Sequence, residues 1–148
     1  MNQIDARPFL IAAYEEALLG LREGGLPIGS VLVINNQIVA RGHNRRIQQG
    51  SAILHAEMDC LERAGRLKAS DYQRSTLVST LSPCDMCSGA ILLYKIPRVI
   101  VGENKNFQGP EIYVQSRGVD VQIYNDEACI AMMRDFIASR PELWNEDI

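Results

Sequence analysis

Two short segments of the sequence carry side chains that could perform chemistry, His55-Ala56-Glu57 and Pro83-Cys84-Asp85-Met86-Cys87. Two cysteines three positions apart on the first turn of a helix can offer both sulfurs to one metal ion, and a histidine from elsewhere can supply a third ligand. Three protein ligands leave a fourth position for water, as in catalytic zinc sites, whereas structural zinc sites usually fill all four positions with protein. We therefore predict one Zn²⁺ per chain, held by His55, Cys84 and Cys87.

Glu57 lies two residues after the predicted ligand His55, close enough to reach a zinc-bound water without binding the metal. Zinc lowers the pKa of such a water from about 15.7 toward about 7. A carboxylate beside it can take a proton and pass it to a substrate nitrogen and to a leaving amine. A lone Cys-x-x-Cys pair would also fit a structural zinc half-site or a redox pair. The combination of H-x-E with a later P-C-x-x-C is typical of zinc deaminases that act on nucleobases, so we predict that Glu57 is catalytic.

The elements that must position these residues follow from apolar periodicity and turn signals. Both segments fall near the starts of predicted helices, where helix dipoles help to keep thiols ionised. Strands separated by helices predict an α/β sandwich whose central sheet is covered on both faces, with the first two strands antiparallel and the later ones mostly parallel. Ser82 is placed to cap its helix. We predict helices at 5–23, 53–64, 82–95 and 126–139, and strands at 29–34, 37–41, 76–80, 98–102 and 119–124.

The overall composition describes an ordinary globular chain. At 148 residues it forms a single domain, 1–148, with a net charge of −3 and a pI near 5.4. The basic cluster Arg41, Arg45 and Arg46 is better explained as a solvated loop than as a nucleic-acid patch, so a nucleic-acid partner is not expected. The sequence shows no membrane-spanning apolar run and no secretory signal, and we expect a cytoplasmic protein with reduced thiols. We therefore expect Cys60 and Cys129 to be buried core residues.

Longer segments add a resemblance that is more specific than the metal motif. They are AYEEAL, EGGLPIG, ARGHN, QQGSAILHAE, STLSPCDMCSGAI, IPRVIVGEN and RPELWNEDI. With them the chain resembles the cytidine-deaminase-like superfamily, and most closely the fungal-type cytosine deaminases. The resemblance implies a three-layer α/β/α sandwich with a five-stranded mixed sheet, a homodimer, and a small free base as substrate. Its implied reaction is hydrolytic deamination of cytosine, or of its isomer isocytosine, to uracil and ammonia.

The same resemblance implies roles for residues around the zinc. The Asn44 amide and the backbone N–H of Ala56 would bind the base, and the backbone C=O of Ser82 would contact its amino group. Asp147 would receive the leaving amino group. Aromatic faces suit a flat heterocycle, and the two that would close over the ring are Phe107 and Trp144. Asn44 could instead be a turn residue, and the two aromatic residues could be core.

Three positions near the expected pocket differ from the fungal-type pattern. Ala56 replaces a glycine, Ile47 an aromatic residue and Asn145 a phenylalanine. Cytosine and isocytosine share an oxo–N–amino edge and both give uracil, so the sequence leaves the choice between them open. Deamination of a purine, either guanine or adenosine in tRNA, is an alternative function. A catalytically silent zinc scaffold is another, although such a scaffold has no need of Glu57.

The end of the sequence, 144–148, carries a tryptophan and an isoleucine beside two carboxylates. Chain ends are normally polar and frayed. Pro141 should break the preceding helix, which would free this segment to fold back. We predict that residues 144–148 form a lid over the active site.

Overall fold

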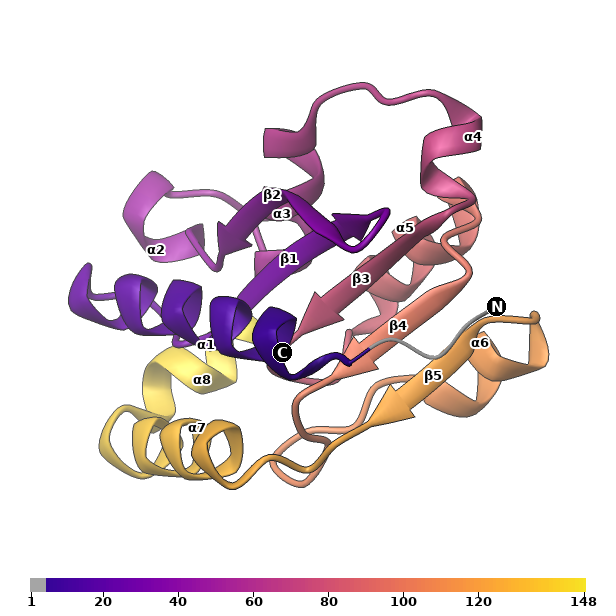
Figure 1. Cartoon of the computed structure of the whole chain (residues 1–148). Coiled ribbons are helices and arrows are strands. Elements are labelled where there is room, and N and C mark those ends of the chain that lie inside the picture. Colours follow the sequence, from indigo (N-terminus) through magenta and orange to yellow (C-terminus); the bar gives the residue numbers. More distant parts are fainter. Residues whose placement is uncertain (1–4) are drawn as a thin grey trace.

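The computed structural model describes residues 5–148 and has a central five-stranded sheet with the strand order β2-β1-β3-β4-β5 (Figure 1). The strands pair antiparallel from β2 to β1 and from β1 to β3, and parallel from β3 to β4 and from β4 to β5. Their bounds are β1 Gly29–Ile34, β2 Gln37–His43, β3 Ser75–Ser79, β4 Arg98–Val101 and β5 Asp120–Ile123. The predicted mixed sheet is confirmed.

Helices cover both faces of this sheet, which makes the three layers (Figure 1). One apolar cluster joins α1 (Arg7–Arg22) and α7 (Glu127–Ser139) to one sheet face, and includes Phe9, Val31 and Cys129. A second cluster joins α3 (Ala56–Ala64), α5 (Asp85–Tyr94) and α6 (Glu111–Ser116) to the opposite face, and includes Leu77 and Cys60. Val31 and Leu77 are completely buried. The two cysteines outside the metal motif are core residues, as predicted.

Glycines let two helices approach the sheet more closely than a side chain would allow. A Cβ on Gly29 of β1 would lie 1.9 Å from the backbone oxygen of Ala13 in α1. A Cβ on Gly42 of β2 would lie 2.4 Å from the backbone nitrogen of Cys60 in α3. Because the obstructing atoms belong to the backbone, no side-chain rotation could relieve such contacts. The two glycines therefore set the separation of α1 and α3 from the sheet.

One sequence prediction about a helix end is wrong. The fifth helix begins at Asp85 with Cys84 as its N-cap residue, and the Ser82 hydroxyl donates to Glu111 instead of capping the helix. The helix before Pro141 does end, at Ser139, and Pro141 occupies the first turn of a new helix, α8 (Pro141–Asp147), where proline is tolerated.

Three further helices are too short to show a periodicity in the sequence, namely α2 (Arg46–Gln49), α4 (Ala69–Tyr72) and α6. Asp126 caps α7, accepting a hydrogen bond from the backbone N–H of Cys129. Within residues 5–148, no helix has both the length and the apolar character that crossing a membrane requires.

Candidate active site

The structure brings His55, Cys84 and Cys87 to one point from two helices. His55 is the N-cap residue of α3, Cys84 is the N-cap residue of α5, and Cys87 lies in the first turn of α5. Nδ1 of His55 lies 3.3 Å from Sγ of Cys84 and 3.8 Å from Sγ of Cys87, and all three ligand atoms lie within 4.8 Å of one another. Ligands bonded tetrahedrally to zinc at about 2.0–2.3 Å are about 3.5–3.8 Å apart. The donor set therefore fits zinc.

The electrostatics of this group favour ionisation of one of its two sulfurs, that of Cys84. A hydrogen bond from the Cys87 thiol lowers the pKa of Cys84 to about 4, and the same contact, together with burial, raises the pKa of Cys87. Burial alone would lower the pKa of His55. Its hydrogen bond with Cys84 and the negative charges of Asp147 and Glu57 outweigh burial, so the pKa of His55 is raised. The thiolate is the form of cysteine that binds metals, and the lowered pKa of Cys84 favours it.

Glu57 lies in the first turn of α3, two residues after His55, and its side chain is buried. Burial raises the pKa of its carboxyl to about 7. A general acid–base group works best when its pKa lies near the working pH, because it can then both accept and return a proton. The position of Glu57 in the pocket wall and this pKa suit proton transfer.

A small pocket adjoins the metal-ligand group. Its volume of about 30 Å³ is far below the roughly 150 Å³ of an engineered apolar cavity that binds benzene. A flat six-membered ring needs more room, so its entry requires the side chains that close the pocket to move. Seven residues predicted from the sequence line it: His55, Glu57, Ser82, Cys84, Phe107, Trp144 and Asp147. The remaining predicted residues, Asn44, Ala56 and Cys87, are completely buried and do not line it.

Comparison with known proteins agrees with this geometry. Residues 4–103 match the family of the cytidine and deoxycytidylate deaminase zinc-binding region. The chain belongs to this family. It is a zinc-dependent nucleobase deaminase, with His55, Cys84 and Cys87 as the group that could bind its ion.

Relatives of this deaminase differ in the molecules that their names describe. It is 48% identical to the cytosine deaminase of Candida albicans over 145 residues, which covers 97% of each chain. It is 41% identical over 112 residues to a tRNA-specific adenosine deaminase of Streptococcus pyogenes, covering 72% of this chain and 69% of that protein.

Solved structures share the fold of the deaminase. A structure from work on tRNA:A34 deaminases superposes with a TM-score of 0.72 at 26% identity, covering 85% of this chain and 99% of the other. The guanine deaminase of Nitrosomonas europaea superposes with a TM-score of 0.76 at 20% identity, covering 93% and 87%. The second likeness shows the fold alone. Together they confirm the predicted cytidine-deaminase-like architecture.

Asp147 in α8 connects the C-terminal segment of the deaminase to the metal-ligand group. Its carboxylate accepts hydrogen bonds from Nδ2 of Asn44 at 3.2 Å to each oxygen, and Nε2 of His55 lies 3.5 Å from one of them. Arg46 donates to the same carboxylate at 3.1 Å and to the backbone oxygen of Glu146 at 2.8 Å. Asn44 accepts a hydrogen bond from the backbone N–H of Arg46 through Oδ1, which fixes the orientation of its amide.

Sequence reasoning missed the role of this basic segment. Arg46 holds Asp147, and Arg45 pairs at 2.9 Å with Asp59, a completely buried carboxylate of α3. Both arginines were expected to be solvated, and that expectation is wrong for these two. Their partners lie 14 and 101 positions away in the chain, so no local pattern could have revealed them. Ile28 and Leu81 also line the pocket without a chemical signal in the sequence.

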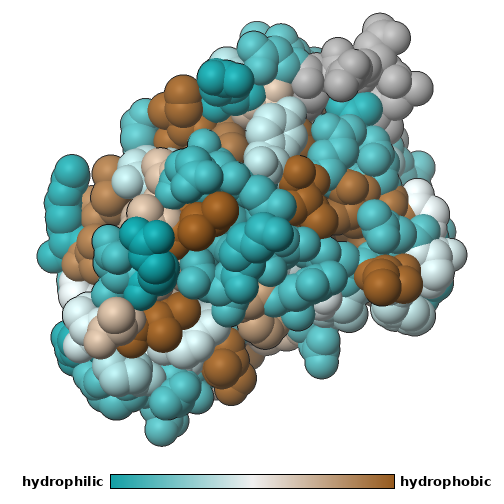
Figure 2. Space-filling view, turned by 90° about the horizontal axis from the view of Figure 1, so that it is seen from below, coloured by the Kyte–Doolittle hydropathy of each residue, from teal (hydrophilic) through white to brown (hydrophobic). Residues whose placement is uncertain are grey.

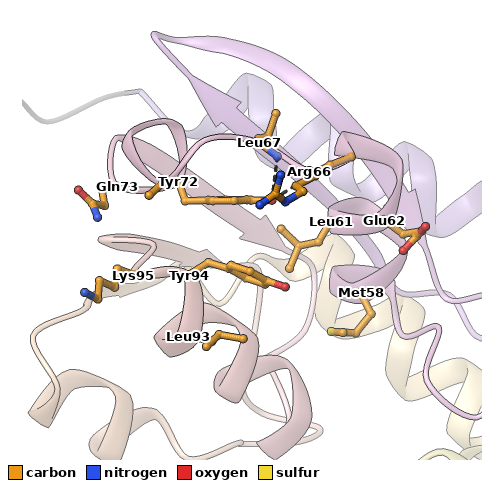
Figure 3. A pocket seen from close by; sticks show the side chains of 12 residues that line it. Met58, Leu61, Glu62, Arg66, Leu67, Tyr72, Gln73, Leu93, Tyr94 and Lys95 are labelled. Atoms are coloured by element: carbon orange, nitrogen blue, oxygen red, sulfur yellow. Dashed lines mark hydrogen bonds between the residues drawn. The ribbon is translucent and has the colours of Figure 1, made fainter.

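A larger hollow, of about 690 Å³, lies between α3, α4 and the end of α5. The rings of Tyr72 and Tyr94 stack there with their centroids 4.8 Å apart (Figure 3). None of the three metal-ligand residues lines this hollow, nor does Glu57. Its size therefore does not make it the active site.

Proposed function

We propose that this deaminase converts free cytosine or isocytosine to uracil and ammonia by hydrolysis. The observation that carries the proposal is that Glu57 and two members of the metal-ligand group, His55 and Cys84, line one pocket together with the aromatic residues Phe107 and Trp144. The 48% identity to a cytosine deaminase across nearly the whole chain supports a pyrimidine base. A pocket that must already open for a flat ring has still less room for an attached ribose, so we expect a free base and not a nucleoside.

In the proposed reaction Glu57 moves the protons. Zinc, when bound, supplies a coordinated water with a pKa near 7. Glu57 takes a proton from water and delivers it to the ring nitrogen next to the amino-bearing carbon, and the hydroxide left behind forms a C–O bond with that carbon. Glu57 then takes the proton of the new hydroxyl and transfers it to the exocyclic nitrogen, the C–N bond breaks, and ammonia leaves. The ring carbon keeps the oxygen of the water as an oxo group.

The remaining predicted residues would bind and orient the base. We assign to the Asn44 amide and the backbone N–H of Ala56 the recognition of the oxo–N edge, and to the backbone C=O of Ser82 a contact with the amino group. Asp147 would accept the amino N–H groups. The Asn44 amide donates to Asp147 in the closed structure, so a bound base has to share or replace this hydrogen bond. Phe107 and Trp144 would cover the ring and exclude water.

The test is an ammonia-release assay with cytosine, isocytosine, guanine, cytidine and adenosine on zinc-loaded protein. We expect one of the two free pyrimidine bases to react fastest. Protein with Glu57→Gln serves as the matched negative control, because it keeps the size of the side chain and removes its ability to carry a proton. Faster turnover of cytidine would contradict the free-base assignment, and faster turnover of guanine or adenosine would favour the purine alternative.

We also propose that the deaminase forms a homodimer through the hollow lined by Tyr72 and Tyr94. Leu93, at its rim, is 70% exposed, and the lining carries both acidic Glu62 and basic Arg66, which two copies related by a twofold axis could pair. By contrast, apolar side chains on the face seen in Figure 2 form small patches among hydrophilic ones. Light scattering should give twice the chain mass, and Leu93→Asp should reduce it to the chain mass. A wild-type monomer would contradict the proposal.

A further inference from the structure

Glu111, the first residue of α6, has a buried carboxylate that the proposed reaction does not use. Within residues 5–148 no cationic side chain forms an ion pair with it; three neutral groups donate to it instead. Oε2 accepts from the Ser82 hydroxyl at 2.6 Å, and Oε1 accepts from the side-chain amides of Asn104 at 3.1 Å and Gln108 at 3.3 Å. A buried carboxylate is costly unless hydrogen bonds compensate it, and these three hydrogen bonds compensate the burial of Glu111.

These contacts join two segments that both reach the pocket. Ser82 lines the pocket and lies two residues before Cys84. Asn104 and Gln108 belong to the loop between β4 and α6, and this loop carries Phe107. The backbone N–H of Gly109 donates to the Ser82 hydroxyl at 3.0 Å. The Ser82 side chain therefore bridges Glu111 and the loop.

Close packing leaves the loop little freedom at this point. A Cβ on Gly109 would lie 1.8 Å from the backbone oxygen of Pro83, so the loop backbone lies directly on the segment that leads to the metal ligands. At the start of the loop, the buried Glu103 carboxylate accepts from the backbone N–H groups of Lys105 and Asn106. The loop that carries Phe107 is thus fixed on one side by the Glu103 carboxylate and on the other by the Glu111 carboxylate.

Phe107 meets Trp144 across the pocket. Their ring centroids are 6.2 Å apart with an interplanar angle of 77°, an edge-to-face arrangement. Trp144 belongs to α8, and no hydrogen bond of its side chain is found in the described chain that would hold it against Phe107. The position of the Phe107 loop therefore decides how the two rings close the pocket.

We propose that Glu111 is a positioning residue for the pocket: it holds the 103–110 loop on Ser82 so that Phe107 faces Trp144 where the two rings close the pocket. A carboxylate suits this task because it only accepts hydrogen bonds and has two oxygens with which to do so. One oxygen anchors the segment before Cys84, and the other anchors the loop. The proposal rests on this pocket being the substrate site.

The experiment uses the tryptophan itself, because Trp144 is the single tryptophan of the chain. Zinc-loaded Glu111→Ala should show red-shifted Trp144 emission and increased acrylamide quenching. For the base that the wild type turns over, KM should rise about tenfold and kcat should change less than about threefold. This pattern is expected when a variant loses binding energy that contributes equally to the ground state and the transition state. Zinc content should stay near wild type.

Conservative and coupled variants distinguish positioning from a general loss of stability. Glutamine at 111 can keep an acceptor for the loop amides and donate to the Ser82 hydroxyl, so Glu111→Gln should retain emission and KM within about threefold of wild type. Ser82→Ala removes the shared hydroxyl and should reproduce part of the Glu111→Ala effect. The double variant should then show less than the sum of the two effects. As a control, Val99→Ala, in the core under α5, should lower the melting temperature without changing either readout.

Several results would overturn the proposal. Wild-type emission, quenching and KM in Glu111→Ala would do so, as would a change confined to the melting temperature. Equal effects of glutamine and alanine at position 111 would contradict the role of the acceptors. If Glu111→Ala does not fold, Ser82→Ala gives the same test. If the wild type turns over none of the bases, the proposed function is wrong. The emission and quenching of Trp144 still test whether Glu111 positions the loop.

Discussion

Adding a single methyl group at Gly42 should displace the helix that carries His55 and Glu57. The new Cβ would lie 2.4 Å from the nitrogen and 2.7 Å from the Cα of Cys60, whereas ordinary contacts of such a carbon begin at 3.4 Å. The gap between β2 and α3 is therefore about 1 Å too small for alanine. Both obstructing atoms are backbone, so α3 must shift as a unit or β2 must bend.

This shift would act on the metal site because only one ligand lies on α3. His55 caps α3, whereas Cys84 and Cys87 lie on α5. Metal–ligand distances tolerate deviations of about 0.2 Å, and a misplacement of about 1 Å can reduce turnover by about 10²-fold. We expect Gly42→Ala to lose zinc to a chelator much faster than wild type, to lose about 10²-fold in kcat, and to be destabilised by about 1–3 kcal/mol through overpacking.

The assay combines zinc analysis after dialysis, the rate of zinc transfer to a colorimetric chelator, ammonia release and thermal melting. Gly89→Ala is the matched control, because Gly89 lies in the other ligand-bearing helix and a Cβ there would meet nothing within 4 Å. It should keep its zinc and gain about 0.5–1 kcal/mol, the helical preference for alanine over glycine. Wild-type zinc retention and turnover in Gly42→Ala would refute the argument that β2 sets the position of His55.

Three further predictions concern single groups. Glu57→Gln should keep zinc and the fold but lose at least about 10²-fold in kcat for ammonia release; near-normal turnover in zinc-loaded protein would mean that another residue moves the protons. Burial raises the pKa of Cys60 to about 12, so at pH 8 this thiol should react with an aromatic disulfide reagent only after denaturation, as followed by absorbance. Deleting residues 144–148 should leave zinc bound and remove most activity. It should also lower the melting temperature, because Trp144 packs with Met133 and Phe136; a fully active truncated protein would contradict the lid.

Much of the architecture could be predicted from the sequence because the burial of a helix or strand determines the local pattern of apolar residues. The run from Gly29 to Ile34 is completely apolar apart from Ser30, and all six residues are buried in an interior strand of the sheet. The metal-ligand group could be predicted for a related reason. His55 stands at the start of α3, after β2, and Cys84 at the start of α5, after β3. Because β2 and β3 are both antiparallel to β1, they run in the same direction and lead to the same edge of the sheet, where the two helix starts can meet.

Features that depend on partners distant in the sequence could not be predicted. Ser82 has the residue type and position of a helix cap, yet its hydroxyl binds Glu111, 29 positions later. Pro141 looks like a helix terminator, yet it starts α8, whose stability comes from packing Trp144 into a core cluster. The roles of Arg46 and of the Asn44 amide depend on Asp147 in the same way. Propensity describes a residue and its neighbours, whereas these outcomes are decided by tertiary contacts.

The arrangement of ligands on two helix starts also ties metal binding to folding. An ion held by His55 with Cys84 and Cys87 joins α3 to α5, and it binds the folded chain far better than the unfolded one. By mass action, such a ligand adds about 4 kcal/mol to the free energy of unfolding when its free concentration is a thousand times the Kd. The melting temperature of this protein should therefore rise with the free zinc concentration. A variant that weakens the site will look unstable in zinc-poor buffer even when its packing is intact, and a melting series across free zinc concentrations separates the two causes.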